Sequence, residues 1–315
     1  MIRTVAGLTI GIALLSIGFA RAQEPAQKLL RGIYQELVEI DTSDATGNTT
    51  RAAEAMAARL RAGGIPAADI HVIVPPGGAK KGNLVARLRG SGAKKPLLLL
   101  AHIDTVNAKR EDWQRDPFKL IEENGYFYAR GSSDDKAMAA ALVAIMIELK
   151  QQNVRLNRDL ILALTADEEI IPSKFSGIEY LIKNHRSLID AEFALNEGGG
   201  GLLDKNGRPL YHGIQAGEKV FQTYRLEVTN PGGHSARPSK DNAIYHLAAG
   251  LARLAQYDFP FKLLPVTRSY FERAADFESG QLAADMKAIV REPPDAAALA
   301  RLSGIPIFNA LMRTT

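Results

Sequence analysis

The stretch Leu97-Leu98-Leu99-Leu100-Ala101-His102-Ile103-Asp104 joins a short, wholly apolar run to a histidine and an aspartate. An apolar run of this length is typical of a strand that is buried on both faces of a sheet. Similar runs recur, so we expect strands at residues 83–89, 96–101, 160–166 and 193–196. Helical patterns lie around them at residues 25–39, 50–62, 136–150 and 178–184. Together these patterns predict an α/β fold with a mostly parallel sheet flanked by helices.

The pattern changes near Gly213. Residues 219–229 alternate polar and apolar side chains, which is typical of a half-solvated antiparallel strand. Residues 242–256 place apolar side chains on one helical face. We therefore expect a first domain over residues 23–214 and a smaller α+β domain over residues 215–315.

The beginning of the chain has the pattern of a secretory signal peptide over residues 1–22. Arg3 precedes an apolar run at residues 5–19, and Ala20-Arg21-Ala22 fits the small-x-small cleavage motif. An uncleaved membrane anchor is the alternative, but the run is shorter than the roughly 20 residues that span a bilayer. We expect an exported protein, periplasmic or extracellular, with no stable membrane insertion after cleavage.

The composition excludes several classes of protein. The chain has no cysteine, so thiol catalysis, disulfides and cysteine-bound zinc are excluded, and any metal site must use histidine and carboxylates. Its net charge is only +4 at pH 7, and part of that charge belongs to the signal peptide. This charge is too small to indicate a nucleic-acid partner or an anionic membrane surface.

Acidic and histidine residues follow the expected strands or open a helix. These clusters are His102 with Asp104, Asp134 with Asp135, Asp167 with Glu168 and Glu169, and Glu197. Ligands of open α/β sheets bind at the carboxyl ends of the strands, so the clusters are expected to converge there. Carboxylates packed together cannot all stay ionised without a compensating cation. The sequence therefore predicts a divalent metal site, with two metals that share a carboxylate.

Each cluster also has a purely structural alternative when it is taken alone. A histidine after a strand is often structural, and an Asp-Asp pair at the start of a helix often caps it. A Glu-Glu pair is often a solvated surface, and the glycine run at residues 198–201 is compatible with a simple loop. The common placement of the clusters at strand ends is what favours the metal site.

Five motifs also carry a resemblance to a known family. The chain resembles the co-catalytic zinc exopeptidases and deacylases of peptidase clan MH, which include carboxypeptidase G, aminoacylase, carnosinase and the succinyl-diaminopimelate desuccinylases. The resemblance covers roughly residues 25–315. The motifs are, in order, Ala101-His102-Ile103-Asp104-Thr105-Val106, Arg130-Gly131-Ser132-Ser133-Asp134-Asp135-Lys136, Ala166-Asp167-Glu168-Glu169, Asn196-Glu197-Gly198-Gly199 and Gly232-Gly233-His234-Ser235-Ala236-Arg237-Pro238.

The resemblance implies a set of metal ligands. His102 and Glu197 would bind the first metal, Glu169 would bind the second, and Asp134 would bridge both. The implied cofactor is a pair of divalent ions, taken as zinc, with cobalt or manganese as alternatives.

The resemblance also implies catalytic roles for three residues. Asp104 would accept the second ring N–H of His102, and Glu168 would be the general base that takes a proton from water. His234 would reach the active site of a partner subunit from a lid and dimerisation domain, which implies a homodimer.

The end of the chain departs from the family pattern. Family members return from the lid to the catalytic domain, and that segment supplies a histidine ligand of the second metal. After His234 this chain has only His246, which lies inside an expected helix. Residues 309–315 are interpreted as the start of a lid strand. We therefore interpret the sequence as a fragment of a longer enzyme or as the product of a premature stop, in which the part of the catalytic domain that follows the lid is absent.

The implied function is hydrolysis of an amide bond with release of a terminal amino acid from a peptide, as in carboxypeptidases and dipeptidases. The alternatives are an N-acyl-amino-acid deacylase on the same scaffold and an inactive, truncated metal-binding protein. Retention of Glu168 argues against a pure binder, because a binder needs no general base. A serine hydrolase is disfavoured, since no Gly-x-Ser-x-Gly motif is present.

Overall fold

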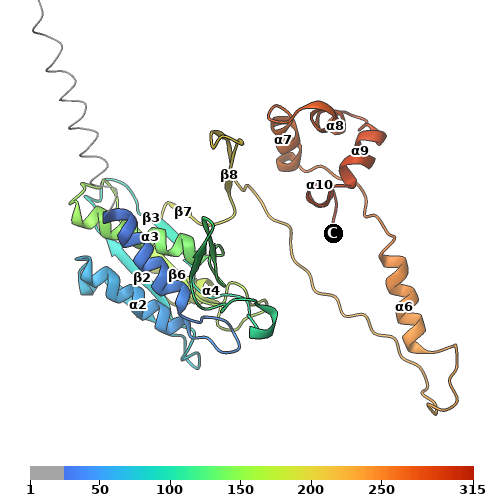
Figure 1. The fold of residues 1–315 in the computed structure, drawn as a ribbon, viewed down its shortest axis with the longest axis horizontal. Coiled ribbons are helices and arrows are strands. Elements are labelled where there is room, and N and C mark those ends of the chain that lie inside the picture. The colour runs from blue at the N-terminus through green and yellow to red at the C-terminus, as the bar shows by residue number, and fades with distance from the viewer. Residues whose placement is uncertain (1–24) are drawn as a thin grey trace, which may run out of the picture. The chain divides into compact units, whose positions relative to one another are not determined.

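The computed structural model describes residues 25–315, so the expected signal peptide lies outside the described residues. The chain divides into two compact units, one ending at Glu197 and one formed by Gly198–Thr315 (Figure 1). Among residues 25–315 there is no helix with the length and apolar character needed to cross a bilayer.

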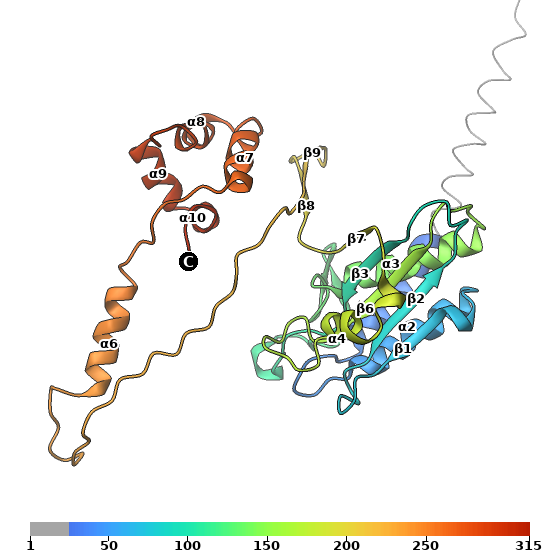
Figure 2. The same ribbon diagram turned by 180° about the vertical axis from the view of Figure 1, so that it is seen from behind.

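A five-stranded sheet is the centre of the first unit (Figures 1 and 2). Strands β3, β6 and β7 are mutually parallel, and β1 points the same way, while β2 runs in the opposite direction. This arrangement confirms the mostly parallel sheet expected from the sequence. In spatial order the strands are β1 (Ile70–Ile73), β2 (Asn83–Leu88), β6 (Leu160–Thr165), β3 (Leu97–His102) and β7 (Phe193–Leu195).

Helices cover both faces of this sheet. Leu99 and Leu162 pack in a core with the helical residues 25–39, α2 and α3, whereas Leu98 and Ile161 pack with Leu181 of α4 on the other face. Alternate residues of a strand point to opposite faces, so a strand buried on both sides must be apolar at every position. The helices are α2 (Thr49–Ala62), α3 (Lys136–Gln151), α4 (Gly177–Asn184) and α5 (Arg186–Ile189).

Short elements complete the first unit. A hairpin pairs β4 (Ile121–Glu123) with β5 (Tyr126–Tyr128). Its turn uses Asn124 and Gly125, both with positive φ, as a tight hairpin requires. Two 3₁₀ turns, η1 (Ala67–Asp69) and η2 (Arg110–Asp112), lie in the connections.

The second unit contains one hairpin and several helices. A small core gathers the apolar faces of its last four helices, with Phe271, Met286, Leu302, Phe308 and Met312 buried. The elements are β8 (Gly200–Leu203), β9 (Pro209–Gly213), α6 (Ala243–Leu254), α7 (Pro265–Ala274), α8 (Gly280–Ile289), α9 (Ala296–Ser303) and α10 (Pro306–Met312).

Two expectations for the second unit are wrong. Residues 309–315 do not begin a strand, because Pro306 starts helix α10. Phe308 and Met312, four residues apart, lie on one face of this helix and are buried. Residues 219–229 form no strand in the described chain, and their apolar side chains are exposed, Tyr224 by 80%. An alternating segment becomes a strand only when a second strand supplies its hydrogen bonds.

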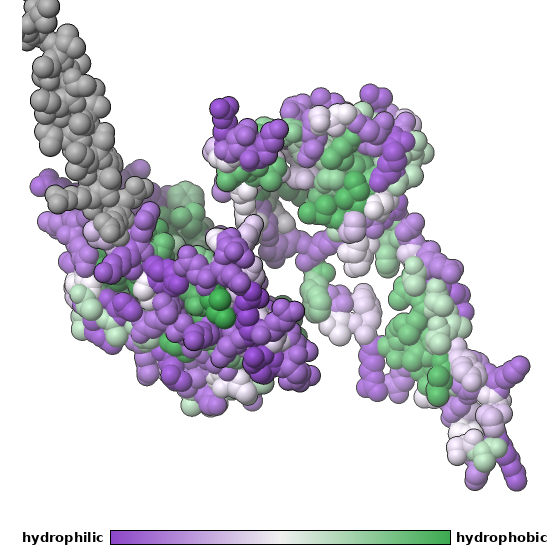
Figure 3. Space-filling view, viewed as in Figure 1, coloured by the Kyte–Doolittle hydropathy of each residue, from purple (hydrophilic) through white to green (hydrophobic). Residues whose placement is uncertain are grey.

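The expected helix over residues 242–256 is confirmed as α6, which begins at the cap of Asn242. Asn242 Oδ1 accepts a hydrogen bond from the backbone N–H of Tyr245. The apolar side chains of α6 remain exposed, Ile244 by 76% and Leu254 by 51%, and Figure 3 shows apolar surface along this helix.

Gly177 permits a close approach between α4 and the start of β2. A Cβ at this position would overlap Asn83 Oδ1 and lie 2.7 Å from the backbone nitrogen of Ala166. We expect Gly177→Ala to lower the free energy of unfolding by about 1–3 kcal/mol, measured by denaturant titration. Gly32→Ala is the control, because the nearest atom lies 4.0 Å from the added Cβ. In a helix interior, Ala raises the free energy of unfolding by about 0.5–1 kcal/mol relative to Gly. Equal stability of Gly177→Ala and the wild type would contradict this packing.

Candidate metal centre

The predicted ligands come from the carboxyl ends of neighbouring parallel strands. His102 is the last residue of β3, Glu168 and Glu169 follow β6, and Glu197 follows β7. Asp134 lies just before α3, which packs on the same strands. The sheet order β6-β3-β7 therefore brings these groups to one edge, as the sequence analysis expected.

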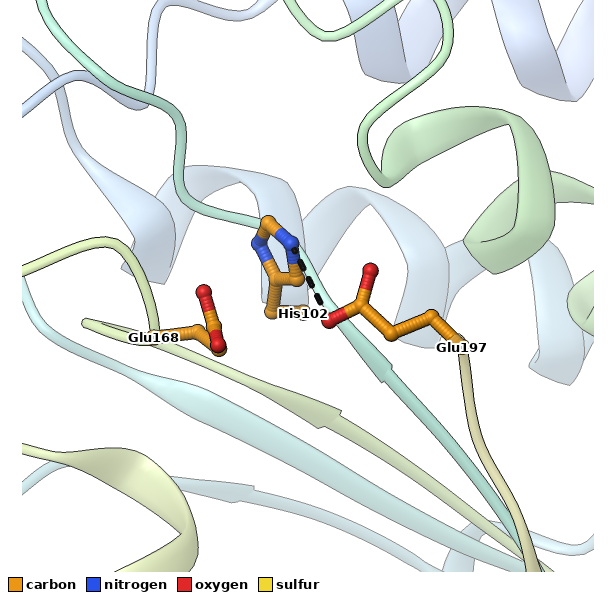
Figure 4. A group of neighbouring side chains, drawn as sticks. All are labelled: His102, Glu168 and Glu197. Carbon is orange, nitrogen blue, oxygen red and sulfur yellow. Dashed lines mark ion pairs between the residues drawn. The ribbon is translucent and has the colours of Figure 1, made fainter. Parts of the chain in front are cut away.

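His102 lies at the centre of the cluster and is only 3% exposed. Its Nε2 is 2.9 Å from Asp134 Oδ1 and 3.8 Å from Glu197 Oε1. Figure 4 shows the imidazole between the carboxylates of Glu168 and Glu197, which come from different loops. A single imidazole thus faces several carboxylate oxygens.

Two overlapping groups have ligand atoms close enough to hold an ion. One is His102, Asp134 and Glu169, and the other is His102, Glu168 and Glu197, with the ligand atoms of each group within 4.8 Å of one another. Imidazole and carboxylate ligands without thiolate suit zinc, manganese and similar divalent ions. The groups contain all four predicted ligands, and they add Glu168 as a further oxygen within reach.

Asp104 connects the histidine to the Glu-Glu segment. His102 Nδ1 is 3.1 Å from the backbone oxygen of Asp104 and 3.5 Å from its carboxylate, so an Nδ1–H there donates to Asp104 and leaves Nε2 for a metal. The same carboxylate accepts hydrogen bonds from the backbone N–H groups of Glu168, at 3.2 Å, and Glu169, at 3.1 Å. This second role was not anticipated from the sequence.

The electrostatics of the cluster favour a cation. Burial lowers the pKa of His102, but the carboxylates of Asp104, Asp134 and Glu197 outweigh it and raise the pKa to about 10. Burial, together with Asp134, raises the pKa of Glu169 above its usual value. Without a metal, the site therefore holds a proton that a divalent cation can replace.

Two buried ionisable residues, Asp135 and Lys136, directly follow Asp134. The sequence analysis placed Asp135 in an acidic cluster but gave neither residue a role. Asp135 is 4% exposed, and its Oδ2 is buried without a hydrogen-bond partner among the described residues, so burial raises its pKa to about 7. Lys136 is fully buried, donates from Nζ to the backbone oxygen of Ile40 at 2.7 Å, and has its pKa lowered by burial to about 7. The position of Lys136 at the start of an apolar, Ala-rich helix was the sequence feature that could have indicated its burial.

His234 belongs to the second unit and is exposed. Its Nδ1 accepts a hydrogen bond from the backbone N–H of Ala236 at 3.1 Å, which forms a local turn. Its role across subunits stays a prediction.

The chain is similar to several known proteins. A family profile described as "Peptidase family M20/M25/M40" matches residues 98–292, more than half of the chain. The N-fatty-acyl-amino acid synthase/hydrolase PM20D1 of Homo sapiens is 33% identical over 168 residues, which is 53% of this chain and 33% of that protein. Acetylornithine deacetylase of Proteus mirabilis (strain HI4320) is 27% identical over 244 residues, 74% of this chain and 58% of that protein.

A solved structure, the M20 family metallo-carboxypeptidase Sso-CP2 from Sulfolobus solfataricus, matches with a TM-score of 0.47 and 27% identity. The match covers 57% of this chain and 39% of that one. With PM20D1, this chain matches only about a third of the relative's length.

Proposed function

The chain belongs to the peptidase family M20/M25/M40, and on this premise we propose that it is a metal-dependent hydrolase that cleaves an amide bond. The proposed reaction releases a terminal amino acid from a peptide. One observation carries the proposal: the buried His102 lies next to carboxylates from three loops. The ligand atoms of each candidate group lie within 4.8 Å of one another. We propose that this donor set holds two divalent ions, taken as zinc, with cobalt or manganese as alternatives.

The residues of the site have two roles in hydrolysis, metal binding and proton transfer. We assign His102, Asp134, Glu169 and Glu197 to metal binding. When bound, a divalent ion lowers the pKa of a coordinated water and polarises the scissile carbonyl. Glu168 accepts the proton of the attacking water and delivers it to the leaving nitrogen.

Asp104 orients these groups through hydrogen bonds. It fixes the His102 tautomer through Nδ1 and holds the backbone of the Glu168–Glu169 pair through its carboxylate. Hydrogen bonds of this kind orient ligands and raise their basicity.

An N-acyl-amino-acid deacylase is the second candidate. The names of two similar proteins favour it, since one is an N-fatty-acyl-amino acid synthase/hydrolase and the other an acetylornithine deacetylase. Both reactions break an amide bond next to an amino acid, so the metal chemistry is shared and only the substrate differs.

The experiment is a hydrolysis assay on matched substrates with and without metal. Dipeptides and N-acyl amino acids with the same terminal residue would be compared after chelation and after return of zinc, cobalt or manganese. Metal-restored hydrolysis of either class supports the hydrolase, and the preferred class selects between the two candidates. Metal binding without turnover of any amide would favour a metal-binding protein without catalytic activity.

Metal binding is expected to release protons. Because the pKa of His102 is raised to about 10, its imidazole is protonated at pH 7 and a metal must displace that proton. We expect the ion that binds His102 to release about one proton at pH 7, and its affinity to fall about tenfold for each pH unit lowered. Calorimetry in buffers of different ionisation enthalpy measures this, and a heat independent of the buffer would contradict it.

The same pKa predicts the pH dependence of the metal-free fold. The folded pKa of about 10 lies above the ordinary value of 6.5, so protonated His102 stabilises the fold. This contribution is complete below about pH 6.5 and is lost as the pH rises through about 10.

We propose that residues 215–315 belong to a lid and dimerisation domain and that the protein is a homodimer. The exposed apolar side of α6 supports a protein contact there.

We further propose that the protein is exported to the periplasm or the extracellular space, directed by residues 1–22. Fractionation of cells that express the chain would test this.

If His234 serves a partner's active site, His234→Ala should lower turnover about 10²-fold or more with metal content unchanged. His246→Ala is the matched control, since His246 is an exposed histidine of α6 paired with Asp241. Mixing His234→Ala with a metal-site variant should restore part of the activity. Unchanged turnover in His234→Ala would exclude this role.

A further inference from the structure

The segment that carries Glu168 and Glu169 leaves β6 through an unfavourable backbone conformation. Asp167, directly before Glu168, has φ of +59° and is only 3% exposed. A residue with a side chain adopts this left-handed conformation at a cost and keeps it only where surrounding contacts hold it. The contacts that hold Asp167 therefore control the direction in which the next two side chains leave.

The carboxylate of Asp167 is bound by two residues that belong to neither candidate metal group, Lys81 and Ser173. Lys81 Nζ lies 2.7 Å from Asp167 Oδ1, and Ser173 Oγ donates to Asp167 Oδ2 at 2.7 Å. Lys81 also pairs with Asp44 at 2.7 Å, on the exposed side. Asp167 thus belongs to neither candidate metal group, although it adjoins two of their members.

Asn83, two positions after Lys81, holds the residue that precedes Asp167 in the same segment. Asn83, fully buried, accepts a hydrogen bond from the backbone N–H of Ala166 at 2.9 Å. Its Nδ2 donates to the backbone oxygens of Ile73 and Lys81, each at 3.3 Å. Asn83 at the start of β2 and Lys81, just before β2, therefore bind two successive residues of the turn, Ala166 and Asp167.

Asp104 holds the following two residues, because its carboxylate accepts hydrogen bonds from the backbone N–H groups of Glu168 and Glu169. We propose that Lys81 and Asn83 are positioning residues that fix the 166–169 turn, and through it the carboxylates of Glu168 and Glu169. The proposal rests on the proposed function for the use of those two carboxylates. Lys81 also neutralises Asp167, which keeps an additional carboxylate away from the ions.

Hydrogen exchange of the turn tests the proposal without a metal or a substrate. In Lys81→Met, we expect the backbone amides of Glu168 and Glu169 to exchange at least about tenfold faster than in the wild type. Lys80→Met, an exposed neighbouring lysine, and Asp44→Asn, which removes only the outer partner of Lys81, should leave that exchange unchanged. Lys81→Arg should restore part of the protection, because it retains the charge.

Lys81 borders an open surface hollow with Asp44 and Asp167, so its replacement leaves no closed cavity and the variant should fold. If Lys81→Met does not fold, Ser173→Ala removes the other contact of Asp167 and gives the same readout. Exchange at Glu168 and Glu169 within about twofold of the wild type in a folded variant would overturn the proposal.

Cobalt titration adds a readout of the metal site. We expect Lys81→Met to bind Co²⁺ about tenfold more weakly and to change the visible spectrum of the bound ion, while Lys80→Met does neither. Wild-type affinity and spectrum in Lys81→Met would contradict the positioning role. If the wild type binds no Co²⁺, the proposed function fails, and the exchange measurement still decides the role of Lys81.

Discussion

Glu168→Gln is expected to lower the rate of amide hydrolysis by about 10²–10⁴-fold while the metal content stays at the wild-type level. The amide of glutamine has the shape of the carboxylate but cannot accept the proton of the attacking water. Glu168 stands on the Asp104-held turn beside Glu169, so its replacement leaves the hydrogen bonds of that turn in place.

Glu179→Gln is the matched control, because Glu179 is an exposed residue of α4 in the same unit. Metal content, measured by elemental analysis beside the rate, separates two roles for Glu168. Its carboxylate lies in one of the candidate ligand groups, so loss of metal in Glu168→Gln would mean that it is a ligand instead of the base.

Asp134→Ala is expected to remove both ions, with a loss of affinity of at least about 100-fold. Asp134 Oδ1 lies 2.9 Å from His102 Nε2 and groups with Glu169, so its carboxylate faces ligands proposed for each metal. A carboxylate has two anionic oxygens, so Asp134 would be able to hold one ion with each of them.

Asp112→Ala, an exposed aspartate of η2, is the control for loss of one surface charge. The number of ions bound per chain is the measurement. Retention of one ion at wild-type affinity in Asp134→Ala would contradict the bridging role and leave a single-metal site.

Much of the first unit could be predicted from the sequence because its strands are buried on both faces. Leu98 and Leu99 are adjacent yet pack into different cores, so the pattern had to be apolar throughout. The convergence of His102, Glu168 and Glu197 followed from the same expectation, since parallel neighbouring strands end at one edge.

The second unit was harder to predict because its elements depend on their partners. Residues 219–229 have a strand-like alternation without a paired strand among the described residues. Residues 309–315 were misinterpreted as the start of a strand, although Pro306 and the spacing of Phe308 and Met312 indicate a helix. In both places a short local pattern was interpreted without knowledge of what packs against it.

The supporting contacts of the site could not be predicted for a different reason. Lys81 and Asp167 are far apart along the chain, as are Asp104 and the amides of Glu168 and Glu169. Such contacts are set by sheet order and loop paths, and no spacing in the sequence encodes them. The sequence identified the residue types that can bind a metal, and the structure identified the groups that hold them.

Metal binding by the purified chain tests the central claim most directly. Titration of the metal-free protein with Zn²⁺, followed by calorimetry and elemental analysis, should show two ions per chain with release of protons. His102→Ala should lose at least the ion that His102 binds, because His102 belongs to both candidate groups. No binding by the wild type, or the same binding by His102→Ala, would contradict a metal centre at the carboxyl edge of this sheet.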